Sequence, residues 1–157
     1  MKKVILIFLL VIIKIYGQNG IRGTNWGMSK SQISRSETSN FIMEGKYILL
    51  CRELDVVNTD VLEYTDIIFD RRTHILYHFN NAARLIGITF RFDTSPPLGD
   101  VLDAFDAKYG AHEYIKDGMV NYYEYYFNDT KIEVRQVETT TVVMITYIPS
   151  QSNTDKY

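Results

Sequence analysis

The feature that most constrains the fold of this chain is a series of short strand-like runs separated by turn residues. The clearest run covers 83–93, where Ile86, Ile88, Phe90 and Phe92 alternate with Leu85, Gly87, Thr89 and Arg91. A period of two residues is typical of a strand with one buried face. Similar runs occupy 47–56, 64–69, 74–79, 112–116, 120–127, 131–137 and 141–148. The sequence therefore predicts antiparallel sheet, with hairpin turns at Asp117-Gly118 and Asn128-Asp129.

Two helices are predicted between these runs. Ser29, followed three residues later by Gln32, has the spacing of a capping box and indicates a short helix before the first run. Pro96-Pro97 ends the preceding strand and favours the start of a second helix, which Gly110 is expected to terminate. The apolar side chains of this second helix fall on one face, namely Leu98, Val101, Leu102, Phe105 and Tyr109.

The order of these elements predicts an α+β fold. We expect two repeats, at 27–93 and 95–148, of a helix followed by a four-stranded antiparallel meander, with the helices packed on one face of the sheet. The alternative architecture is a single helix on a strongly curved sheet, as in cystatin-like folds. In either case one compact domain follows from the length of the chain.

The first 17 residues have the pattern of a secretory signal peptide. Lys2 and Lys3 precede an apolar run from Val4 to Ile13, which is too short to span a bilayer as a helix. A small residue, Gly17, stands where cleavage is expected, before Gln18. We therefore expect residues 18–157 to form a single domain that is exported to the periplasm or secreted, without stable membrane insertion.

Charge and cysteine content exclude several classes of protein. The chain has 17 basic and 19 acidic side chains, and loss of the three lysines in 1–17 would lower its formal net charge from −2 to −5. Nucleic acid is therefore not an expected partner. The single cysteine, Cys51, cannot form an intramolecular disulfide and is expected to be buried, although a disulfide between two copies stays open. The oligomeric state is also left open.

No cofactor or metal is expected from the sequence. His74 and His78 are four residues apart in a strand-like run, where that spacing spans about 13 Å, so they cannot share one ion. Phosphate-binding glycine loops, nucleophile elbows and zinc-protease motifs are all missing. We therefore predict that the protein is not an enzyme.

The start of the first helix carries a resemblance to known families. Gly27-Met28-Ser29-Lys30-Ser31-Gln32-Ile33 resembles the glycine-methionine helix opening of the BamE family of outer-membrane assembly lipoproteins. The order of helices and strands over about 24–148 is similar to that of the beta-lactamase inhibitory proteins. The resemblance implies an exported domain that acts by binding another protein.

The candidate binding site comes from the tyrosine-rich run at 120–127. With Asn128-Asp129 as a two-residue turn, Tyr126 faces Lys131, Glu124 faces Glu133 and Tyr122 faces Arg135. The six side chains then share one exposed sheet face: Tyr122, Glu124, Tyr126, Lys131, Glu133 and Arg135. Tyrosine beside arginine and lysine is typical of protein interfaces. This composition predicts a non-enzymatic module that holds another envelope or secreted protein.

A second interpretation of the same face involves carbohydrate. Two carboxylates opposed across strands lie roughly 5 Å apart, which is the spacing found in retaining glycosidases, and tyrosines can stack on sugar rings. The alternative function is therefore a small glycan-binding or glycoside-hydrolysing protein that uses Glu124 and Glu133.

Overall fold

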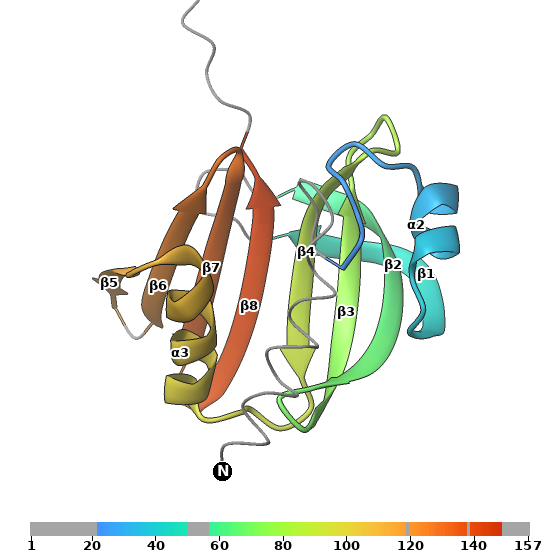
Figure 1. Ribbon diagram of the computed structural model, residues 1–157. Helices are drawn as coiled ribbons and strands as arrows, with labels where there is room; N and C mark the ends of the chain where they lie inside the picture. Colours follow the sequence, from blue (N-terminus) through green and yellow to red (C-terminus); the bar gives the residue numbers. More distant parts are fainter. Residues whose placement is uncertain (1–21, 50–56, 119, 138, 149–157) are drawn as a thin grey trace, which may run out of the picture.

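The computed structural model describes residues 22–49, 57–118, 120–137 and 139–148 (Figure 1). The predicted signal peptide and Cys51 lie outside these residues. The helices are α2 (Lys30–Ser36) and α3 (Leu98–Tyr109). The strands are β1 (Asn40–Leu49), β2 (Val57–Ile68), β3 (Arg71–Phe79), β4 (Leu85–Phe92), β5 (Glu113–Asp117), β6 (Val120–Phe127), β7 (Thr130–Val137) and β8 (Thr140–Tyr147).

Both helices begin near the predicted residues, and α3 also ends where expected. The Gln32 side chain accepts a hydrogen bond from the Ser29 backbone N–H at 2.9 Å, which is one half of the expected capping box. Helix α3 is followed by Gly110, whose φ of 87° few other residues adopt readily. Among the described residues, no helix is both long and apolar enough to cross a membrane.

The eight strands form one antiparallel sheet in the order β1-β2-β3-β4-β8-β7-β6-β5. Strand β4 joins the two groups of strands, because Ile88 and Phe90 pair with Ile145 and Val143 of β8. The prediction of two helix-plus-meander repeats is therefore wrong: the protein is mostly sheet, a single continuous one, with two short helices. The alternative with one helix does not fit either.

The reason for this difference lies in how the apolar side chains are buried. One core cluster runs along the sheet from Leu62 on β2 to Tyr125 on β6 and includes Ile33 of α2 and Val101 of α3. Helices of 7 and 12 residues cover only parts of such a sheet, so neither half encloses a core of its own. Both helices pack on the same face, which we call the helix face (Figure 1).

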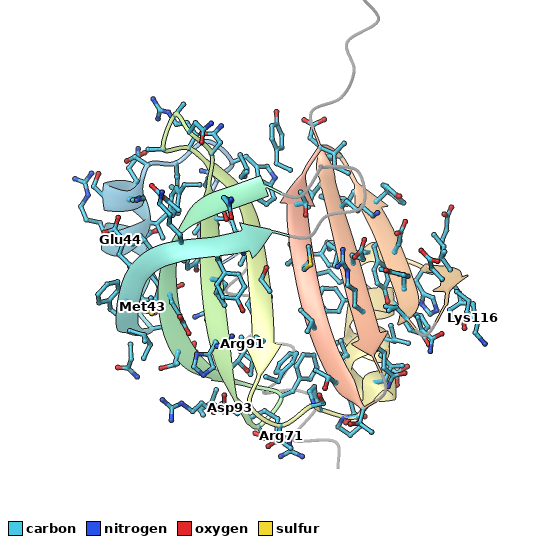
Figure 2. All side chains as sticks on the ribbon, turned by 180° about the vertical axis from the view of Figure 1, so that it is seen from behind. Met43, Glu44, Arg71, Arg91, Asp93 and Lys116 are labelled. Carbon is cyan, nitrogen blue, oxygen red and sulfur yellow. The ribbon has the colours of Figure 1, made fainter. Side chains whose placement is uncertain are left out.

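Strand β1 bends across the opposite face of the sheet, which we call the open face (Figure 2). Two contacts fix its second half there. The Tyr47 hydroxyl accepts a hydrogen bond from Arg91 of β4 at 3.0 Å, and the Tyr47 ring meets the His78 ring edge-on with centroids 6.3 Å apart. The first half of β1 lies beyond these contacts, at the outer end of the sheet.

Candidate functional site

The hairpin of β6 and β7 has the predicted register. Tyr126 pairs with Lys131, Glu124 with Glu133 and Tyr122 with Arg135, as expected for a two-residue turn at Asn128-Asp129. Tyr125 and Ile132, which alternate with the candidate residues along the two strands, belong to the core on the helix face. The six candidate side chains therefore share the open face. The predicted pairing of the six side chains and their common face are therefore confirmed.

The predicted exposure of this face is wrong for its three central charges. The Lys131 side chain is 1% exposed, and those of Glu124 and Glu133 are each 3% exposed. Lys131 Nζ lies 2.9 Å from Glu124 Oε1 and 3.2 Å from Glu133 Oε2, so one ammonium stands between the two carboxylates. Such burial is tolerated because opposite charges are paired within it.

The remaining three side chains close around this ion cluster. The Tyr126 hydroxyl donates a hydrogen bond to Glu124 Oε2 at 2.8 Å, and Lys131 Nζ lies 5.8 Å from the centre of the Tyr126 ring. Arg135 donates to Glu133 and also lies over the Tyr122 ring, 5.3 Å from its centre. Only Tyr126 presents more than half of its surface to solvent. The six side chains therefore form a network that uses its charges internally.

This arrangement does not favour glycoside hydrolysis. A glycosidase needs one carboxylate that reaches the sugar and one that transfers a proton to the leaving oxygen. Here Glu124 and Glu133 are buried and both face the same lysine. Neither carboxylate is placed to meet a substrate.

The two histidines of β3 have separate surroundings on the open face. His78 is buried between Thr59 and Thr89, whose hydroxyls each lie 2.9 Å from a ring nitrogen. Burial lowers the pKa of His78 to about 4. His74 instead lies between Glu63 and Asp93, at 2.5 and 2.9 Å. In the part of the chain that the structure describes, no group of three or more histidine, cysteine or acidic side chains could hold a metal ion.

A charged cluster ties the segment before α2 to the sheet. Arg22 Nη2 lies 3.3 Å from Glu37 and 2.7 Å from Asp66, and the buried Tyr77 hydroxyl donates to the same Glu37 carboxylate. Burial by itself raises the pKa of Glu37, but the hydrogen bonds from Arg22 and Tyr77 hold it at about 2. The two carboxylates also accept hydrogen bonds from the backbone N–H groups of Thr38, Ser39 and Ile67, and such a satisfied arrangement is typical of a structural cluster.

Strand β1 carries four exposed bulky side chains and begins earlier than predicted. We predicted a strand at 47–56, of which 50–56 lie outside the described residues, whereas β1 begins at Asn40 and ends at Leu49. Phe41, Ile42, Met43 and Tyr47 are 57%, 43%, 45% and 40% exposed. The β1–β2 register shifts between Phe41 and Met43, so the side chains do not alternate regularly here, and all three of them are exposed. A run of three bulky apolar residues was the signal for this strand.

The outer edge of β1 is also unpaired within the described residues, since β1 ends the strand order. The other end of the sheet is different. Strand β5 has five residues and carries Glu113, Lys116 and Asp117, which are the features that protect a sheet edge from pairing. Figure 2 shows Met43 and Glu44 of β1 at one end of the molecule and Lys116 of β5 at the other. The two edges therefore differ: β5 is short and carries several charges, whereas β1 is longer and exposes bulky apolar side chains.

Comparison with known proteins gives no relative for this chain. No protein-family model, no curated protein and no solved structure matches it.

Proposed function

We propose that this protein is a non-enzymatic binding module that holds another polypeptide along β1. The observation that carries the proposal is the combination of an unpaired strand edge with three adjacent apolar side chains, Phe41, Ile42 and Met43, all more than 40% exposed. Exposed apolar strands at a sheet edge pair with extended segments of other chains, because backbone hydrogen bonds and apolar contacts form together.

The proposed location differs from the tyrosine-rich face of β6 and β7 that the sequence predicts. The charges on that face are engaged with one another, so they have little to offer a partner. Tyr126 and Phe127, both exposed, lie at the β6–β7 turn and supply at most a small contact. We further propose that the module acts outside the cytoplasm, on the evidence of the basic and apolar pattern of residues 1–17.

The test is site-specific photo-crosslinking in the native host. A photoreactive phenylalanine analogue would replace Ile42 on β1, and a control would carry it in place of Ile67. Ile67 is a suitable control because it is 61% exposed and lies on β2 beyond Thr65, the partner of Asn40. We expect a protein adduct from the first position only. Absence of an adduct, or equal adducts from both positions, would contradict the proposal.

A further inference from the structure

The sequence of β1 is chemically symmetric about its glycine. From Phe41 to Leu49 it consists of three apolar residues, Glu44, Gly45, Lys46 and three more apolar residues. When this sequence is read backwards, apolar residues again stand at the apolar positions, and Glu44 and Lys46 exchange places. Because an antiparallel partner presents its sequence in reverse, a second copy of β1 is complementary to the first.

We propose that the partner of β1 is β1 of a second copy of this chain, paired antiparallel about Gly45. This inference rests on the proposed function, since it names the polypeptide held by the same strand. In this register Glu44 lies opposite the second copy's Lys46, and Met43 lies opposite the second copy's Tyr47. Each pair occurs twice because the interface is two-fold symmetric.

Other registers lack this complementarity. A centre at Glu44 places two glutamates opposite each other, and a centre at Lys46 places two lysines opposite each other, which destabilises a strand pair. A shift by one position places Met43 opposite Lys46 or Glu44 opposite Tyr47. Only the centre at Gly45 pairs apolar side chains with apolar ones and charges with their opposites.

The exposure of β1 fits this arrangement. The Glu44 side chain is 57% exposed although it lies 2.5 Å from Lys30, and Lys46 is also exposed. Both charges can therefore reach across to a second strand. Gly45 lies between them without a side chain, and the Met43 methyl group lies over it: a Cβ added at Gly45 would meet that carbon at 2.7 Å. The Met43 side chain therefore covers the central position, where Gly45 has no side chain of its own.

The mass of the protein in solution is the first measurement. The chain is expressed from its full sequence in a secreting host and purified under reducing conditions, so that Cys51 cannot link two copies. Sedimentation velocity over a series of concentrations is expected to show a monomer and a dimer in exchange. Met43→Lys is expected to weaken the dimer about tenfold or more, and Ile67→Lys to leave it unchanged. A wild-type chain that stays monomeric would overturn the inference.

Two charge variants test the register. Glu44→Lys alone makes both facing side chains basic, and Lys46→Glu alone makes both acidic, so each variant is expected to be monomeric by itself. When the two variants are mixed, every facing pair is again opposite in charge, and a heterodimer is expected. Because each variant keeps its own intrachain changes in the mixture, recovery cannot come from repaired folding. Variants that dimerise alone, or fail to combine, would contradict the register.

The two proposals can fail separately. If the photoreactive analogue at Ile42 captures a different polypeptide while the purified chain stays monomeric, the second copy is wrong as the partner but β1 remains the binding strand. If the analogue captures nothing and the chain is monomeric, both proposals are wrong.

Discussion

At the scale of single residues, the open face holds ionisable groups whose burial has consequences for stability. His78 is buried between two threonine hydroxyls, and Lys131 is buried between two glutamates. A buried neutral histidine makes folding sensitive to acid, whereas a buried ion pair makes folding sensitive to the loss of either partner. The two sites therefore lead to different measurements.

His78 is expected to make the protein less stable in mild acid. Its pKa is about 4 in the folded chain and 6.5 in a solvated histidine, so the unfolded chain binds a proton that the folded chain excludes. This contribution to the free energy of unfolding is fully present above pH 6.5 and is lost as the pH falls to about 4. At about 1.4 kcal/mol per pKa unit, the total loss is about 3 kcal/mol. Urea unfolding at several pH values measures it.

The control for this prediction is His78→Gln, which removes the titrating group but keeps a polar side chain. Between pH 6.5 and 4 its stability should change less with pH than that of the wild type. His74 and His112 are present in both proteins, so a difference in how stability changes with pH comes from His78. Equal slopes would show that His78 is not the source.

Removal of the buried ammonium is expected to be costly. Lys131→Met leaves Glu124 and Glu133 buried beside each other without the lysine, and breaking a buried ion pair in this way lowers the free energy of unfolding by about 3 to 5 kcal/mol. The triple variant Glu124→Gln, Lys131→Met, Glu133→Gln removes the charges together and should recover most of the loss. Chemical denaturation compares them. A triple variant no more stable than Lys131→Met would argue against this account.

At the scale of elements, α3 is attached to the sheet mainly through β6. The Tyr125 hydroxyl donates to Asp106 of α3 at 2.9 Å, and His112 lies 2.9 Å from the same carboxylate oxygen. The Tyr125 ring also packs against Phe105 and Tyr109, with centroids 5.7 and 6.3 Å away. One tyrosine therefore holds the helix by both its ring and its hydroxyl.

Tyr125→Phe isolates the hydroxyl. We expect the free energy of unfolding to fall by about 1 kcal/mol, because one part-buried hydrogen bond to a charged group is lost, and amide exchange in α3 to become faster. The matched control is Tyr114→Phe, whose hydroxyl donates to Asn121 at 3.0 Å on an exposed strand and should matter little. Similar losses in both variants would mean that α3 is not held by this contact.

Helices and strands could be predicted from the sequence where turn residues mark their ends, but not where contacts with distant residues determine their length. The Asn128-Asp129 turn fixed the register of β6 and β7 from sequence alone. In contrast, β2 extends from Val57 to Ile68 although only 64–69 was predicted, because acidic residues disfavour a strand by propensity. Asp60 and Glu63 lie within it because Lys30 and His74 pair with them, and no local pattern reveals those partners.

The candidate site shows the same division. The alternation of residues placed all six side chains on one face correctly, since strand geometry is local. The burial of Lys131 is not local, and charged side chains are almost never fully buried unless they are paired, so sequence reasoning assigned it to solvent. On β1 the register shifts between Phe41 and Met43, and this bulge interrupts the alternation that would have identified the strand.

At the scale of the whole molecule, a residue near α2 contacts the far half of the sheet. The indole N–H of Trp26 donates to Thr130 of β7 at 3.0 Å, and its ring lies 5.8 Å from that of Tyr147 on β8. With β4 paired to β8, the first and last parts of the described chain share one core. The two groups of strands should therefore not unfold independently.

The single tryptophan makes this cooperativity measurable. Because Trp26 reports on contacts between the halves and far-UV circular dichroism reports on the whole sheet, both signals should give the same urea midpoint. Thr130→Val should lower both midpoints together, by the loss of about 1 kcal/mol. A fluorescence transition that precedes the circular dichroism transition would show that the halves separate first.

The order of the strands also determines how the chain reaches this structure. Six of the seven strand pairings join strands that are consecutive in the sequence, whereas β4 must find β8 across α3 and three intervening strands. Strands that are consecutive in the sequence pair quickly, because only a short loop has to close. Strands that are far apart in the sequence pair slowly, because the chain loses more conformational entropy before their contacts form. We therefore expect assembly of the β4–β8 pair to be the slow step of folding, and until it occurs the edges of these two central strands are open to other chains.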